Sequence, residues 1–168
     1  SNYNVLVLDQ NLRNNGYITF TNTNVLRSGD FYDANVSGLN TKFNSKNNDY
    51  FLETFSVISS QIENSNNTIG HSWGAEAGKQ RGQLTFGVEY YEESDTYDPN
   101  DLGFLRANNS RATEIYFGYR DFNPKINHLN KFFSEFSIYN ERLYAPNLHG
   151  GTFWNANATI ISNSFNAT

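Results

Sequence analysis

Acidic side chains that could bind a cation are concentrated between residues 92 and 101. The segment EESDTYDPND contains Glu92, Glu93, Asp95, Asp98 and Asp101. Calcium takes carboxylate and carbonyl oxygens from flexible loops of this kind, but the segment lacks the regular ligand spacing and the final glutamate of an EF-hand loop. We therefore interpret it as a solvated acidic loop, with calcium binding as the alternative and no other cofactor expected.

Three further carboxylates, Glu89, Glu114 and Glu135, fall in segments where polar and apolar residues alternate. Paired carboxylates are the catalytic groups of glycoside hydrolases, which makes a hydrolase one possibility. Alternation also places each of them on the polar side of its segment, which would face the lumen of a membrane barrel, and Arg120 near Glu114 would there join a lumen charge network. Polar residues on such a side need no catalytic explanation, so we predict a structural role for all four and no enzymatic activity.

Other reactive groups give little indication of chemistry. The histidines, His71, His128 and His149, lack metal-ligand spacing. Cysteine is absent, which excludes disulfides, thiolate metal sites and cysteine catalysis. The net charge of -5 gives no reason to expect nucleic acid as a partner.

The elements that must position these residues are predicted to be β-strands. Segments with a period of two, bounded by Asn, Asp, Gly and Ser, recur along the whole chain, and no sustained apolar stripe has helical spacing. Nine strands are predicted, at 2–10, 15–24, 34–43, 50–59, 71–78, 82–92, 110–120, 131–140 and 152–162. Most are near ten residues, which is the length of a tilted strand that crosses a bilayer rather than of a typical soluble strand.

Alternation assigns faces most clearly in the second half of the chain. Leu84, Phe86, Val88 and Tyr90 share one face, opposite Glu89 and its polar neighbours. The later strands repeat the pattern: Ile115, Phe117 and Tyr119 in one, Phe136 and Ile138 in the next, and Trp154, Ala156, Ala158 and Ile160 in the last. In the early strands Glu53 falls on the same face as Phe51 and Phe55, so the sequence does not assign those faces.

The links between strands are predicted to alternate in length. Those near 11–14, 44–49 and 79–81 are short, whereas those near 25–33, 60–70, 93–109 and 141–151 are longer, and the link at 121–130 is ambiguous. Short turns on one rim and long loops on the other describe an outer membrane barrel. Aromatic residues flank two links, Phe43 with Tyr50 and Tyr119 with Phe132, as in an aromatic girdle or, alternatively, as cross-strand packing in a soluble sheet.

The predicted fold class is therefore all-β: an antiparallel up-and-down meander of about nine strands that forms part of a transmembrane β-barrel. Methionine is absent, including at position 1, and the predicted topology starts with a strand that runs downward from the outer surface. We expect residues 1–168 to be a single internal segment of a larger barrel protein, preceded by at least one further strand.

One segment resembles a known family. The run from Tyr97 to Arg106, YDPNDLGFLR, followed by Asn108 and Asn109, is similar to a motif of Bacteroidetes envelope proteins classified as domain of unknown function 5916. The opening NYNVLVLDQNL and the run LRSGDFYDANVSGLNTKF also resemble that family, and the likeness extends over most of residues 2–125. Long members carry an N-terminal domain like family 9 carbohydrate-binding modules before a region expected to be a membrane barrel.

The resemblance implies an internal portion of that barrel, without established catalytic residues. Its motif falls in the predicted loop at 93–109 and includes Asp98, Asn100, Asp101, Leu102, Gly103 and Phe104. Because the last three are apolar or small for an exposed loop, we expect them to pack back against the barrel wall or to plug its mouth.

The sequence supports two functional hypotheses. The first is a structural portion of a bacterial outer membrane barrel that acts as a pore, a transporter or a subunit of an envelope assembly, with the lipid bilayer and possible envelope proteins as partners. The second is a secreted soluble β-sandwich or small barrel that binds glycans, in which Phe31, Tyr32, Tyr97 and Trp154 would stack on sugars.

Overall fold

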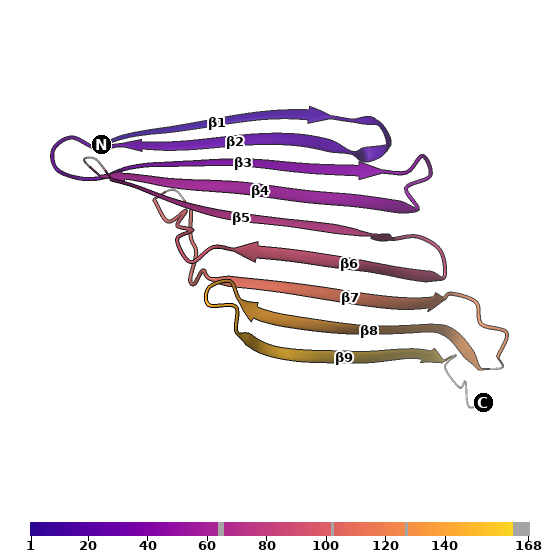
Figure 1. Ribbon diagram of the computed structural model, residues 1–168. Helices are drawn as coiled ribbons and strands as arrows, with labels where there is room; N and C mark the ends of the chain where they lie inside the picture. The colour runs from indigo at the N-terminus through magenta and orange to yellow at the C-terminus, as the bar shows by residue number, and fades with distance from the viewer. Residues whose placement is uncertain (64–65, 102, 127, 163–168) are drawn as a thin grey trace, which may run out of the picture.

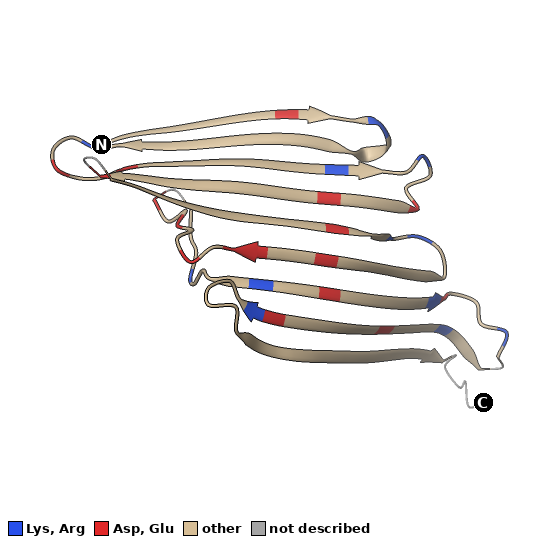
Figure 2. Ribbon diagram, viewed as in Figure 1, with Lys and Arg blue, Asp and Glu red and all other residues tan. Residues whose placement is uncertain are grey.

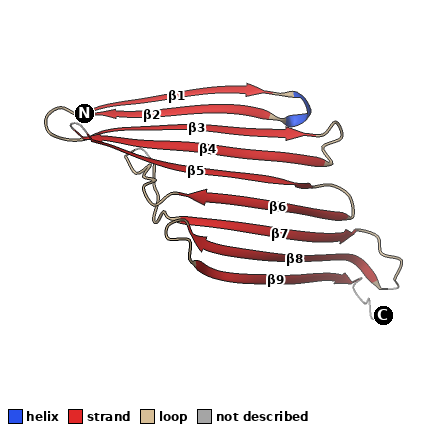
Figure 3. Cartoon of the chain, viewed as in Figure 1, coloured by secondary structure: helices blue, strands red, loops and turns tan. Residues whose placement is uncertain are grey.

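The protein folds into one antiparallel β-sheet (Figure 1). The computed structural model describes residues 1–63, 66–101, 103–126 and 128–162. The strands are β1 (Asn2–Asn11), β2 (Tyr17–Leu26), β3 (Asp33–Asn44), β4 (Tyr50–Glu63), β5 (Asn66–Lys79), β6 (Leu84–Glu93), β7 (Ser110–Asp121), β8 (Leu129–Leu143) and β9 (His149–Ser162). A single 3-10 turn, η1 (Arg13–Asn15), is the one helical element among these residues (Figure 3).

The strand order follows the chain, so each strand pairs antiparallel with the next. This confirms the predicted all-β meander of nine strands. The sheet does not close on itself: β1 and β9 each pair on one side only and leave two unpaired edges. No second sheet packs on the first among the residues described, so they do not form the sandwich of the soluble alternative. None of the described helical residues forms a helix long and apolar enough to cross a membrane.

The predicted regular alternation of link lengths is wrong. The link expected at 60–70 is largely strand, because β4 runs to Glu63 and β5 begins at Asn66. The link expected at 141–151 shrinks to residues 144–148. Among the links predicted to be long, the segment between β6 and β7, residues 94–109, is the one that keeps its predicted length. Side-chain alternation fades in the outer parts of these strands, but the backbone ladder continues because its hydrogen bonds do not depend on side-chain polarity.

The register places apolar residues of neighbouring strands directly opposite one another. Phe86 pairs with Phe117, which pairs with Phe136, and the next row joins Val88, Ile115, Ile138 and Trp154. We call the side of the sheet that carries these residues the apolar face. It is not covered: Phe86 is 37% exposed, Phe117 50% and Ile160 65%. The predicted sharing of one face is confirmed for β6 to β9.

Charged residues are separated between the two sides of the sheet. On the apolar face, each charged strand residue that the structure describes is one of the first two or last two residues of its strand; these residues are Asp33, Lys79, Glu92, Arg111, Asp121 and Arg142. The opposite side, which we call the charged face, carries Lys42, Glu53, Glu76, Glu89, Glu114 and Glu135 in the interiors of β3 to β8. Figure 2 shows the acidic residues crossing the middle strands as one row.

Candidate functional site

Four glutamates form a continuous row across the charged face. Glu53 in β4 lies directly opposite Glu76 in β5, Glu76 opposite Glu89 in β6, and Glu89 opposite Glu114 in β7 (Figure 2). Cross-strand neighbours of this kind have Cβ atoms about 4.5–5.5 Å apart, and like charges directly opposite each other are destabilising. We call these four residues the acidic row. An arrangement that costs stability in this way is a candidate functional feature.

Hydrogen bonds hold part of the acidic row in place. The Tyr17 hydroxyl donates to Glu53 Oε1 over 2.8 Å, and the Lys42 ammonium donates to Glu53 Oε2 over 2.8 Å. The Tyr116 hydroxyl donates to Glu76 Oε1 over 2.6 Å. The Lys42 ammonium therefore balances the charge of Glu53 at one end of the row. Glu89 in the centre and Glu114 at the other end form no such ion pair among the described residues.

Glycines make room for the aromatic side chains that lie along the row. A Cβ at Gly87 would overlap the ring of Tyr116, which crosses β6 from β7 to reach Glu76 in β5. A Cβ at Gly74 would overlap the ring of Phe55 in the same way. Glycine is required wherever a neighbouring ring lies this close to the backbone. The glycines of β5 and β6 thus allow rings to lie flat on the sheet beside the carboxylates.

The charged face also contains two cavities. One of about 220 Å³ is lined by Glu53, Glu76 and Glu89. The other, of about 470 Å³, is lined by Glu114, Arg120 and Glu135 among others. The structure thus brings three of the predicted lumen residues, Glu114, Arg120 and Glu135, to one cavity and places Glu89 in the acidic row beside Glu114.

Sequence reasoning missed Glu53 and Glu76 as members of this site. Glu53 shares its face with Phe51 and Phe55, which made that face look mixed. A signal was present in β5, where Gly70, Gly74 and Gly78 recur every four residues and so all point to one face. Glycines at this spacing indicate a face on which aromatic rings from a neighbouring strand can lie against the backbone.

The acidic row projects from one face of a single sheet, which limits what it can do chemically. Glycoside hydrolysis needs two carboxyl groups that flank the scissile bond. Cross-strand neighbours point side by side from the same surface, so the row alone offers no such pair. A row of carboxylates can instead attract cations and repel anions along a hydrated surface.

The loop between β6 and β7 fills a gap in the sheet. β5 pairs with β4 along its whole length but with β6 only from Ser72 onward, so the start of β5 has a free edge. The loop occupies this edge: the Ser94 N–H donates to the His71 carbonyl over 2.9 Å, and the Thr96 hydroxyl donates to the Ile69 carbonyl over 2.8 Å. Figure 1 shows the loop between the ends of β5 and β6.

Beyond this edge the loop turns onto the charged face. Tyr97 is 8% exposed, and its backbone lies where a Cβ of Gly70 would be. The Asp98 N–H donates to the Ser59 hydroxyl over 3.0 Å, and Gln61 donates to the Asp98 carboxylate over 2.9 Å. Burial raises the pKa of the Tyr97 phenol, and the Glu93 carboxylate raises it further. The loop is thus packed against this end of the sheet.

The loop is also tied to the link between β2 and β3. Asp101 forms an ion pair with Arg27, and the Tyr32 hydroxyl donates to the same carboxylate over 3.3 Å. Hydrogen bonding to Asp101 raises the pKa of the Arg27 guanidinium. Residues that are far apart in the sequence therefore meet at one rim of the sheet.

The motif residues play different parts in this loop. Asn100 accepts the Leu105 N–H over 2.6 Å. Phe104 is 88% exposed, so it does not pack against the described part of the sheet, and the alternative that it plugs the mouth of a barrel stays a prediction. Gly103 is exposed, and Leu102 lies outside the described residues. The aromatic residue that packs is instead Tyr97, because Gly70 and Ser59 offer it a small-residue surface.

The carboxylates of the acidic segment do not converge. Glu92 points to the apolar face and Glu93 to the charged face, while Asp98 and Asp101 bind different partners. Within the ranges that the structure describes, no three acidic or histidine side chains form a group that could hold a metal ion. This geometry does not support the predicted calcium alternative, which stays a prediction.

Of the aromatic residues expected to stack on sugars in the soluble alternative, Tyr97 is buried, which removes it from that role. Tyr32 is half-buried, with the Arg27 guanidinium 4.5 Å from its ring centroid. Phe31 is 72% exposed and Trp154 75% exposed. Phe31 and Tyr32 lie on the link between β2 and β3, whereas Trp154 lies on β9, at the other edge of the sheet.

The open nine-stranded meander, with its acidic row and packed loop, defines the chain as an all-β protein. Comparison with known families gives a match over residues 1–168 to a family described as a domain of unknown function, DUF5916. The chain belongs to this family, and the match extends beyond the 2–125 expected from the sequence. No curated protein and no solved structure matches the chain.

Proposed function

We propose that this chain is a stretch of the wall of a transmembrane β-barrel in a bacterial outer membrane, with its apolar face toward lipid and its charged face toward a hydrated lumen. The observation that carries the proposal is the separation of charge between the two faces. The apolar face of nine consecutive strands keeps its charged residues at the strand ends. A soluble sheet of this size would cover such a face, since exposed apolar patches of monomers rarely exceed a few hundred Å².

Dimensions along β7 agree with a bilayer. Its apolar face has Arg111 near one end and Asp121 at the other, and the residues between them on this face are Thr113, Ile115, Phe117 and Tyr119. Ten residues of strand span about 33 Å, and a tilt of about 40° reduces this to a height of about 25 Å, the height of the apolar band of outer membrane barrels.

Aromatic residues lie where that band would end. Phe43, Tyr50, Tyr119 and Phe132 lie on the apolar face at the turn end of the sheet, and the Tyr119 and Phe132 rings are 6.1 Å apart. Trp73 and Tyr90 lie toward the loop end, with ring centroids 5.1 Å apart. Tyr and Trp favour both membrane interfaces because their rings are amphipathic.

Closure of the barrel would use the two unpaired edges, β1 and β9. In a bilayer every backbone N–H and C=O must be paired, so both edges would bond to further strands. We propose that these belong to the same larger barrel and that the acidic row lines its lumen. A lumen with such a row favours cations, which suits a pore or transporter.

Neighbouring residues of β8 allow a direct test of which face meets lipid. The chain contains no cysteine, so Ile138→Cys and Ser137→Cys can carry an environment-sensitive fluorophore, one on each face. In vesicles, brominated acyl chains should quench the label at Ile138 and leave the label at Ser137 accessible to aqueous iodide. If the label at Ile138 is quenched by iodide and not by brominated lipid, the membrane proposal is wrong.

A further inference from the structure

Two arginines lie side by side on the apolar face at the loop end of the sheet. Arg111 in β7 is directly opposite Arg142 in β8, and we call this pair the basic row. Its next neighbours are Glu92 in β6 and His149 in β9. Two like charges directly opposite each other destabilise a sheet. The carboxylate of Glu92 is the one negative charge beside the guanidinium groups of Arg111 and Arg142 in this line of paired residues. This part of the face therefore carries an excess of positive charge.

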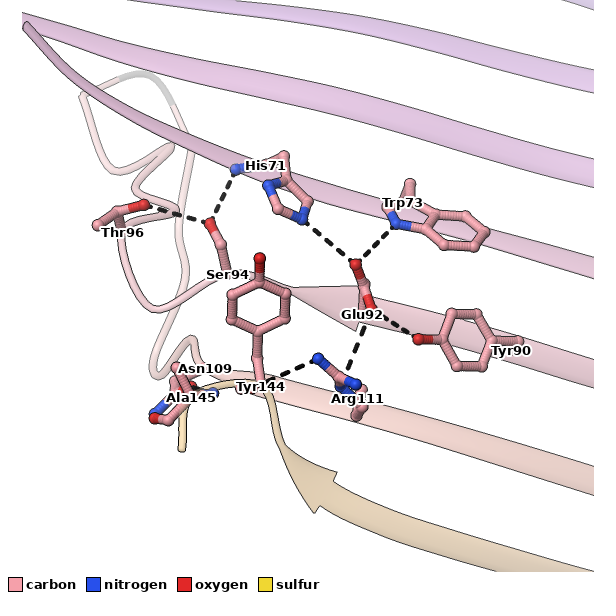
Figure 4. Close-up of polar contacts among 10 residues, drawn as sticks. All are labelled: His71, Trp73, Tyr90, Glu92, Ser94, Thr96, Asn109, Arg111, Tyr144 and Ala145. Carbon is pink, nitrogen blue, oxygen red and sulfur yellow. Dashed lines mark hydrogen bonds and ion pairs between the residues drawn. The ribbon is translucent and has the colours of Figure 1, made fainter. Parts of the chain in front are cut away.

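The Glu92 carboxylate is already held by several donors (Figure 4). The Tyr90 hydroxyl donates to it over 2.6 Å and the Trp73 indole N–H over 3.0 Å, while His71 Nε2 lies 3.4 Å away. Its closest approach to Arg111 Nε is 3.9 Å, an ion pair without a hydrogen bond. The carboxylate is thus fixed by the aromatic residues and does not saturate the arginine.

Both arginines retain donors for an anion. The buried Arg111 Nε has no hydrogen-bond partner among the described residues. The Arg111 guanidinium lies 5.0 Å from the centroid of the Tyr144 ring, and its Nη2 donates to the Tyr144 carbonyl over 3.3 Å, so both the ring and the backbone of Tyr144 hold it. Arg142 Nε donates to Asn147 Oδ1 over 2.8 Å, and its terminal nitrogens have no acceptor within the described ranges. An arginine fork with free donors matches a phosphate group.

The position of the row indicates which anion would reach it. If the apolar face meets lipid, as in the proposed function on which this inference rests, the row lies where the acyl chains end and the headgroups begin. Tyr144 lies beside Arg111, and Trp73 and Tyr90 contact the neighbouring Glu92 (Figure 4). Aromatic rings of this kind sit at the headgroup level. Basic residues next to an apolar band bind anionic lipid headgroups.

We propose that Arg111 and Arg142 form a binding site for the phosphate of an anionic membrane lipid at this rim. Arg142 supplies the uncompensated charge, and Arg111, held by Tyr144, supplies a second donor group. The apolar residues nearer the centre of the strands, Ile138 and Trp154, contact the acyl chains of the same lipid.

The test uses the full-length protein in detergent and counts bound lipids by native mass spectrometry. Phosphatidylglycerol should be retained in preference to phosphatidylcholine, and Arg142→Gln should weaken its binding about fivefold. Arg142→Lys, which keeps the charge, should retain most of the affinity. Arg106→Gln is the matched control: it removes the same charge from the exposed loop at this end of the sheet, outside the row, and should leave the affinity unchanged.

The outcomes separate this inference from the proposed function. If the wild type does not enter bilayers, the proposed function fails. If it enters them but Arg142→Gln binds phosphatidylglycerol as tightly as wild type, or Arg106→Gln weakens it equally, the lipid site alone is overturned. Displacement of the lipid by equal concentrations of inorganic phosphate would identify a site for free anions and would also contradict the proposal.

Discussion

Replacing Phe117 with arginine gives the sharpest measure of what the apolar face contacts. Phe117 is 50% exposed and lies between Arg111 and Asp121 on the apolar face of β7. In a bilayer this position is near the midplane, where an arginine costs about 2–4 kcal/mol. On the surface of a soluble sheet the same substitution stays within about 0.5 kcal/mol. The two environments thus differ by at least about a factor of ten in the folding equilibrium.

A series along β7 makes the measurement independent of local packing. Arginine at Thr113 or Tyr119, nearer the ends of the band, should cost only about 0–1 kcal/mol, so the profile should peak at Ile115 and Phe117. The assay is equilibrium unfolding of the full-length protein from lipid vesicles in urea, followed by tryptophan fluorescence.

The matched control for this series is Ser137→Arg on the charged face. Ser137 lines the larger cavity near Glu114 and Glu135, so an added arginine there should change the free energy of unfolding by no more than about 0.5 kcal/mol. A flat profile along β7, with Phe117→Arg no worse than Ser137→Arg, would refute the reasoning that the apolar face meets lipid.

Three further predictions concern the charged face and the loop. Gly87→Val should destabilise the protein by about 1–3 kcal/mol in the same urea assay, because the new side chain overlaps the ring of Tyr116. Glu89→Gln combined with Glu114→Gln should lower the cation preference of conductance in planar bilayers, because two carboxylates of the acidic row lose their charge. Above pH 10 the loop should become sensitive to protease, since burial raises the pKa of Tyr97 in the folded state above the unfolded value of 10.0.

The sign of the pH effect follows from the neutral phenol. The folded state holds the Tyr97 proton more tightly, so the contribution of Tyr97 to stability is complete below pH 10 and is lost as the pH rises toward its folded pKa. Tyr97→Phe should remove this dependence.

The other two predictions have matched controls. Gly150→Ala, whose Cβ meets only an ordinary contact at 3.4 Å, is the control for Gly87→Val. Asp30→Asn is the charge control for the conductance measurement. Equal effects in these controls would contradict the assignments.

The sequence by itself determined the strands and most of their faces. Period-two alternation predicted nine strands in chain order, and the register confirms the shared face of Phe86, Phe117 and Phe136. This was possible because side-chain direction in a strand depends only on the parity of the residue number. Parity likewise grouped Glu89 with Glu114 on the opposite face.

The tertiary structure alone decided which residues meet across strands. The acidic row depends on the register, which pairs Glu53 with Glu76 and Glu76 with Glu89, and alternation within one strand carries no information on register. Glu53 was missed because Phe55 on the same face made that face look mixed. The sequence does not show that the ring of Phe55 lies over Gly74 of the next strand.

The long loop shows the same limit most clearly. Its apolar residues suggested that Phe104 packs against the sheet, but Tyr97 packs there instead. The reason is that β6 does not reach the start of β5, which leaves a free edge beside Gly70. The offset between two strand ends is a property of the assembled sheet. Local sequence determines which face of the sheet each side chain points to, whereas the pairing of whole strands decides which residues it contacts on that face.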